Sequence, residues 1–218
     1  KKAGYLGTLD PLASGLLVVF FEKATKLIPY FNQAEKHYEV ELELGKVSDT
    51  FDITGKVQEI RDAEFPSKEQ LQKTLASFRG PQWQIQPIFS AIKRKGRRAY
   101  ELAREGKELE MGKRQVEFLK ILLLRYKAPK ARLHVHCSSG TYIRSLVHEL
   151  GGQIGCGAVM TALMRHRVGP FSLPVEHASG KNDFMSSLSP TSVIEEYIDW
   201  KGRSDHEKAY LLKNFAND

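Results

Sequence analysis

A short segment near the start of the chain, residues 4–17, constrains the fold more than any other stretch. It holds three glycines, one proline and one carboxylate, Asp10, between apolar residues. Glycine lets the backbone adopt a positive φ or approach a ligand closely, and Pro11 disfavours a helical conformation at Asp10. Residues 16–21 then form a continuous apolar run, which predicts a buried strand. The pattern places Asp10 on a rigid loop leading into the core, although a turn aspartate that only accepts from a backbone N–H has the same local signature.

Length and composition fit a globular protein with one main domain. The chain has 218 residues, of which 41% are hydrophobic and 27% are charged, enough for a core and a small appendage. Its longest apolar run is too short to span a bilayer, and no charged-then-apolar leader is visible, so we expect a cytoplasmic protein. The net charge of +7 is a weak indication of a polyanionic partner.

Few residues are candidates for metal binding or disulfide formation. The two cysteines, Cys137 and Cys156, predict reduced thiols rather than a disulfide framework. His134 and His136 share one face of a predicted strand and could bind a metal. Because no third ligand stands near them in the sequence, exposed strand histidines are favoured, and we expect no metal site.

Hydrophobic periodicity predicts much of the secondary structure. Residues 37–44 alternate apolar and charged side chains, which is typical of a half-buried antiparallel strand. Ser67 and Gln70 form a capping box at the start of a helix. Residues 115–126 are rich in apolar side chains and predict a buried strand, and residues 131–137 alternate again.

A glycine turn at residues 138–141 leads into a predicted helix. Its apolar stripe consists of Ile143, Leu146, Val147, Leu150 and Ile154. Arg144 lies in the first turn, where the helix dipole disfavours a cation. An arginine placed there needs a carboxylate or phosphate partner, or full exposure to solvent.

The first segment, G-x-x-G-T-L-D-P-x-A-x-G-L-L in residues 4–17, resembles the catalytic loop of the TruB family of pseudouridine synthases, which isomerise a uridine in the T-loop of tRNA. The resemblance covers residues 4–173 and implies an α+β fold with a mixed, mostly antiparallel sheet flanked by helices and loops. It implies that Asp10 is the essential carboxylate and that no cofactor is needed. The family usually has histidine where this chain has Tyr5, and a tyrosine there can still stack and hydrogen-bond.

Five further positions match family motifs, and the resemblance implies a substrate-binding role for each. They are Lys26 in Ala-Thr-Lys, Tyr38 in Lys-x-Tyr-x-Val, Asp52 in T-x-D-x-x-G, and Tyr142 and Arg144 in Gly-Thr-Tyr-x-Arg. The family's arginine pairs with the catalytic aspartate, and its tyrosines pack at the base. Asp52 is either a turn residue or a partner for an arginine. Leu163 matches a leucine of the uracil pocket, and from the pattern alone it is a core leucine.

Residues 93–100 are the most basic window, with five lysines and arginines among eight residues. Charge runs are usually solvated faces, but a glycine within this one and a tyrosine beside it suit a segment that grips RNA. The family has a thumb insertion at this place, here about residues 90–113. The residues expected to contact RNA are Lys93, Arg94, Arg97 and Arg98.

We therefore predict a catalytic domain at residues 1–175, apparently lacking the family's first strand, and a short helical tail or reduced RNA-binding extension at 176–218. The predicted function is isomerisation of a tRNA uridine to pseudouridine by a monomer that binds the T-arm and flips the base. As a hypothesis, Tyr38 also takes the C5 proton. Two alternatives stay open: an RNA-binding chaperone that folds tRNA without chemistry, and the catalytic subunit of a guide-RNA pseudouridylation particle.

Overall fold

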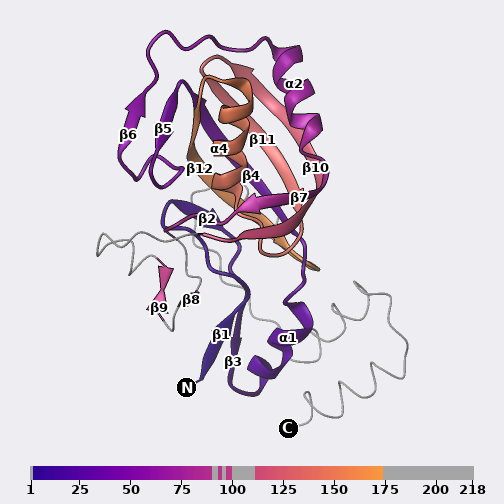
Figure 1. Ribbon diagram of the computed structural model, residues 1–218. Helices are drawn as coiled ribbons and strands as arrows, with labels where there is room; N and C mark the ends of the chain where they lie inside the picture. The colour runs from indigo at the N-terminus through magenta and orange to yellow at the C-terminus, as the bar shows by residue number, and fades with distance from the viewer. Residues whose placement is uncertain (1, 90–92, 95–96, 100–110, 174–218) are drawn as a thin grey trace. The chain divides into compact units, whose positions relative to one another are not determined.

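The computed structural model describes residues 2–89, 93–94, 97–99 and 111–173 (Figure 1). The chain forms two compact units, one from the described parts of residues 1–38 and 164–218, the other from those of residues 39–163. No helix in the described ranges is long and apolar enough to cross a membrane. The predicted tail at 176–218 lies outside the described residues.

The first unit contains short elements around the Asp10 segment. They are β1 (Ala3–Tyr5), β2 (Ala13–Gly15), β3 (Val19–Phe21), the 3-10 helix η1 (Glu22–Leu27), α1 (Ile28–Phe31) and β13 (Phe171–Ser172). Two longer strands, β4 (Lys36–Leu44) and β12 (Ala158–Val168), belong to both units because each crosses a unit boundary.

The second unit carries the longer helices and most of the sheet. Its elements are β5 (Lys46–Ser48), β6 (Val57–Glu59), α2 (Lys68–Ser77), β7 (Gly80–Ile85), β8 (Lys93–Arg94), β9 (Arg97–Arg98), β10 (Lys113–Lys127), β11 (Lys130–Cys137) and α4 (Ile143–Ile154). The main sheet has the order β13-β12-β4-β11-β10-β7, with β2 paired to β12. It is mixed and mostly antiparallel, which confirms the predicted fold class.

The sequence patterns explain how the second unit folds. Strand β4 alternates buried and less buried residues, with Tyr38 on the buried face as its parity predicts. At α2 the predicted capping box is present, since Ser67 accepts from the Gln70 N–H and the Gln70 side chain accepts from the Ser67 N–H. Helix α4 buries four of the five residues of the predicted stripe, and the fifth, Ile154, is partly buried. Helices α2 and α4 contact each other. In addition, α2 packs against β10 and α4 packs against β7 (Figure 1).

The first unit has its own small core. Its buried side chains are Leu6, Phe20, Leu27, Phe31, Ala34, Val168 and Phe171. The Phe31 ring lies 5.9 Å from that of Phe20 and 5.3 Å from that of Phe171, centroid to centroid. Leu6 belongs to the glycine-rich segment, so this segment is anchored in the core four residues before Asp10.

Two predictions about apolar segments were wrong in part. The run at residues 16–21 is not a buried strand: only Phe20 of β3 is buried, and Phe21 is 61% exposed. The apolar run within β10 is half-buried, since Leu122 and Leu124 are exposed. In both cases successive side chains of a strand point to opposite faces, and one face is left open.

Candidate functional site

Asp10 lies in a tight turn between β1 and β2. Its carbonyl accepts a hydrogen bond from the Ala13 N–H at 2.8 Å, and the residue is half-buried. Before the turn, Gly7 has a φ of 69°, and after it Gly15 has a φ of 100°. Glycine adopts these left-handed conformations without the steric cost that a Cβ would add. The two glycines therefore define where the chain enters and leaves the turn.

A buried arginine closes the base of this turn. Arg165 of β12 is 1% exposed. Its Nε donates to the Leu16 carbonyl at 2.8 Å, and its Nη2 donates to the Gly7 carbonyl at 3.2 Å. These two acceptors flank Asp10 in the sequence, so one side chain ties together both ends of the loop. Hydrogen bonds from a charged group are each worth about 1.5–3 kcal/mol.

The backbone of the same residue holds the loop as well. The Leu16 N–H donates to the Arg165 carbonyl at 2.8 Å. A Cβ added to Gly15 would lie 2.3 Å from that carbonyl oxygen and 2.8 Å from the Arg165 nitrogen. Only glycine permits this approach between two backbones. Both the side chain and the main chain of Arg165 therefore hold the Asp10 loop in place.

Lys36 supports the same region from β4. It is 8% exposed, and its Nζ donates to the Ala34 carbonyl at 2.9 Å. A Cβ on Gly7 would lie 3.5 Å from the Lys36 Cε and 3.6 Å from the Arg165 Nη1. Two buried cations therefore lie beneath the entry to the Asp10 turn.

The other predicted residues of the first unit differ in exposure. Tyr38 is buried in β4, Tyr5 in β1 is 52% exposed, and Lys26 in the last turn of η1 is exposed. An exposed lysine and an exposed tyrosine are available to a ligand, whereas a buried tyrosine can act only where a cavity reaches it.

In the second unit, Arg144 is 5% exposed and donates to two backbone carbonyls. Its Nη2 donates to the Phe89 carbonyl at 2.8 Å, and its Nη1 to the Thr50 carbonyl at 3.4 Å. The guanidinium carbon lies 5.8 Å from the centre of the Tyr142 ring, within range of a cation–π interaction. The structure thus brings Arg144 and Tyr142 together at the start of α4.

A glutamine that sequence reasoning missed fixes this helix start. Gln84 of β7 is 2% exposed. Its Oε1 accepts from the Tyr142 N–H at 2.8 Å, and its Nε2 donates to the Tyr142 carbonyl at 2.9 Å. One amide therefore satisfies both backbone groups of the residue that caps α4. Arg165 was also missed. In the sequence Gln84 is one of three alternating glutamines and Arg165 begins an Arg-His-Arg run, so neither stands out from its polar neighbours.

Asp52 organises a compact loop between β5 and β6. It is 3% exposed, and its Oδ1 accepts from the Thr50 hydroxyl at 2.9 Å, the Thr54 N–H at 2.9 Å and the Thr54 hydroxyl at 2.5 Å. These bonds are those of a turn residue. Arg144 contacts the same loop through the Thr50 carbonyl.

The remaining predicted positions are placed as follows. Leu163 is buried in β12. Strands β8 and β9 pair as a short antiparallel hairpin, with Lys93 opposite Arg98 and Arg94 opposite Arg97, and most of the predicted thumb beyond them lies outside the described residues. In the described ranges, no three His, Cys, Asp or Glu side chains form a group that could hold a metal ion.

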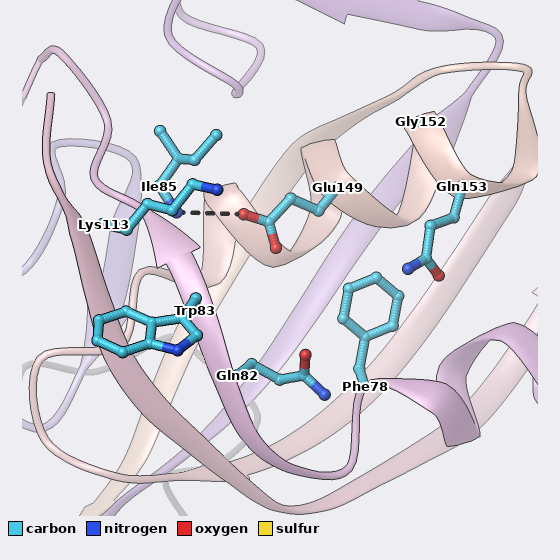
Figure 2. A pocket seen from close by; sticks show the side chains of 8 residues that line it. All are labelled: Phe78, Gln82, Trp83, Ile85, Lys113, Glu149, Gly152 and Gln153. Carbon is cyan, nitrogen blue, oxygen red and sulfur yellow. Dashed lines mark hydrogen bonds between the residues drawn. The ribbon is translucent and has the colours of Figure 1, made fainter. Parts of the chain in front are cut away.

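A separate pocket of about 450 Å³ lies between β7 and α4. Figure 2 shows Trp83 at its edge, with Lys113 and Glu149 lining it. The Ile85 N–H donates to the Glu149 carboxylate at 3.4 Å, and burial raises the pKa of that carboxyl group. None of the predicted site residues lines this pocket.

Comparison with known proteins identifies the class. Residues 1–143 match the model described as TruB family pseudouridylate synthase (N terminal domain). The structure is similar to a chain in "Crystal Structure of a Cbf5-Nop10-Gar1 Complex", with a TM-score of 0.59 and 26% identity over 95% of this chain and 50% of that chain. The fold is therefore that of a pseudouridine synthase.

Two bacterial relatives narrow the assignment. The chain is 45% identical to tRNA pseudouridine synthase B of Chromohalobacter salexigens, over 82% of this chain and 58% of that protein. It is 42% identical to the protein of the same name from Pseudomonas putida, over 99% of this chain and 74% of that protein. The chain belongs to the TruB family, and it spans about three fifths of the length of the first of these relatives.

Proposed function

We propose that this chain converts a uridine in the T-loop of tRNA to pseudouridine, with Asp10 as the essential carboxylate. The observation that carries the proposal is the Asp10 turn, tied at both ends by Arg165 and carrying the family motif. A catalytic group must be held in a productive geometry to contribute fully. A loop closed by a buried arginine supplies that rigidity without using the carboxylate itself.

In the proposed reaction the C1′–N1 bond of the uridine breaks and C1′ bonds to C5 instead. N1 gains a proton and C5 loses one, so the product is an isomer and no oxidant or energy source is consumed. Asp10 acts ionised, as nucleophile or base.

Arg144 is the proposed partner of Asp10, and Tyr142 the proposed ring at the base. Two carbonyls and the Tyr142 ring hold the guanidinium. Asp52 is proposed to act on substrate indirectly, because its carboxylate is taken up by Thr50 and Thr54. Leu163 is proposed to line the uracil pocket.

The target base has to leave its stack, at a cost of a few kcal/mol. Stacking on an aromatic side chain returns about 1–3 kcal/mol per base. Tyr5 is a candidate for this because it is exposed, and Tyr38 is proposed to receive the C5 proton. Lys26 and the basic residues Lys93, Arg94, Arg97 and Arg98 are proposed to contact phosphates of the T-arm.

The test is pseudouridine mapping on an unmodified tRNA transcript incubated with the wild type, Asp10→Asn and Asp62→Asn. Asp62 is exposed with a φ of 55°, a conformation that asparagine tolerates, so its variant is a matched control. Product from the wild type and Asp62→Asn but not from Asp10→Asn supports the proposal. Bound tRNA without product from any of them would favour the chaperone alternative.

A further inference from the structure

Helix α4 contacts the loop after β5 at two points. Arg144 and His148 are four residues apart, so their side chains share one face of the helix. Arg144 donates to the Thr50 carbonyl. The His148 ring stacks face to face on the ring of Phe51, with centroids 3.9 Å apart and planes inclined by 14°. Two neighbouring loop residues thus meet two neighbouring positions on the helix.

Phe51 occupies this position in an unfavourable backbone conformation. Its φ is 67°, in the left-handed region that residues with a Cβ rarely adopt. The backbone around it is bonded on both sides: the Phe51 N–H donates to the Ser48 carbonyl at 3.2 Å, and its carbonyl accepts from the Met160 N–H at 3.2 Å. Strained residues persist where the surroundings over-determine them, and they cluster at functional sites. A glycine would satisfy the backbone here but would leave no ring for His148.

His148 contributes a flat ring rather than an acid or base. Its Nδ1 is buried and has no hydrogen-bond partner among the described residues. Burial lowers the pKa of His148, so the ring is neutral near pH 7. The imidazole stacks on the Phe51 ring, and aromatic pairs favour a limited set of geometries.

We infer that the stacked pair of Phe51 and His148 positions Arg144 for the proposed reaction. The stack locks the loop at residue 51 to α4, and the preceding residue, Thr50, provides the carbonyl that receives the Arg144 guanidinium. Loss of the stack frees the loop at residue 51 from α4, so the Thr50 carbonyl is no longer held against the Arg144 guanidinium. Phe51 and His148 are positioning residues that act through Arg144, and this inference rests on the proposed function.

The experiment uses four variants of the full chain in two matched pairs. Phe51→Gly removes the ring while its backbone conformation stays favourable, so only the contact with α4 is lost, whereas Phe51→Tyr keeps the ring. His148→Ala removes the stack, whereas His148→Phe keeps the stack and removes the nitrogens. Each variant is assayed for kcat and KM with a tRNA transcript and for its melting temperature.

The stack-deleting variants are expected to lose about 10- to 100-fold in kcat, the scale of a misplacement near 1 Å, with KM within about twofold of wild type. The ring-keeping variants are expected to stay within about threefold in kcat, since the catalytic geometry is kept. A loss of melting temperature without loss of kcat in Phe51→Gly and His148→Ala would show a structural role only. Equal loss in His148→Ala and His148→Phe would assign the effect to the imidazole nitrogens. Either result overturns the inference.

A second readout separates this inference from the proposed function. In ¹⁵N-labelled protein, the Arg144 side-chain Nε–H resonance is identified by its absence in Arg144→Lys. It is expected to shift or broaden in Phe51→Gly and His148→Ala but not in their ring-keeping counterparts. An unchanged resonance in all four variants overturns the positioning role even if the enzyme proves active. Absence of pseudouridine from the wild type overturns the proposed function, while this resonance still reports whether the stack fixes Arg144.

Discussion

Gly15→Ala tests how the Asp10 loop is held. A methyl group at Gly15 would lie 2.3 Å from the Arg165 carbonyl oxygen, and the φ of 100° is unfavourable for alanine. The conformational cost is about 1–2 kcal/mol, and moving the crowded backbone adds about 1–3 kcal/mol. The sum is a destabilisation of about 2–5 kcal/mol. For a chain of this size each kcal/mol lowers the melting temperature by roughly 2–4 °C, so a decrease of about 4–20 °C is expected.

Two other glycines serve as controls for the two costs. Gly80 has a φ of 88° with no atom within 4 Å of an added Cβ, so Gly80→Ala measures the conformational cost alone, about 1–2 kcal/mol. Gly152 lies in α4 with equally open space, and Gly152→Ala is expected to stabilise the protein by about 0.5–1 kcal/mol. The assay is thermal unfolding of all three, followed by turnover of a tRNA transcript below the lowest melting temperature.

Gly15→Ala is also expected to lower kcat more than Gly80→Ala does, because the displaced backbone at residue 15 is continuous with the Asp10 turn. If Gly15→Ala unfolds at the same temperature as Gly80→Ala and turns over as fast, the approach of Gly15 to Arg165 is not what fixes the loop. A large loss of stability with unchanged kcat would show that the approach supports folding but does not position Asp10.

Three further predictions concern the second unit. Burial raises the pKa of the Glu149 carboxyl group above 4.5, so the folded state holds this proton more tightly than the unfolded state and loses stability as the pH rises through the raised pKa. Glu149→Gln is therefore expected to raise the melting temperature more at pH 7 than at pH 4. A gain in melting temperature that does not depend on pH would contradict this prediction. Gln84→Leu removes both bonds to the Tyr142 backbone, and because the Tyr142 carbonyl still accepts from the Leu146 N–H, only the Tyr142 N–H is left unbonded. The expected cost is about 1–3 kcal/mol in urea unfolding, while a loss of less than about 0.5 kcal/mol would mean that water replaces the amide. Ser67→Ala removes the capping box of α2 and is expected to cost about 1 kcal/mol by the same measurement, with no change in kcat.

Periodic features were predictable from the sequence because they depend on near neighbours. The alternation of β4, the Ser67 capping box and the stripe of α4 all follow from local spacing. The glycine-rich segment was recognised as a rigid turn for the same reason. Such patterns are set by residues within a few positions of each other.

The contacts that hold the site were not predictable, because they join distant residues. Arg165 donates to the carbonyls of Leu16 and Gly7, which lie 149 and 158 positions away in the sequence. Gln84 bonds to the backbone of Tyr142, which lies 58 positions away. The apolar run at residues 16–21 was misjudged because composition does not show which face of a strand is covered. The left-handed backbone at Phe51 has no signature in a non-glycine residue.

Release of tritium from tRNA labelled at C5 of uridine tests the central claim most directly. Replacement of the C5 proton accompanies formation of the new C1′–C5 bond, so release reports the chemistry rather than binding. With enzyme in excess, we expect the wild type to release the label from one uridine per tRNA and Asp10→Asn to release none while still binding tRNA. Equal release by both proteins, or no release by a wild type that binds tRNA, would contradict the account.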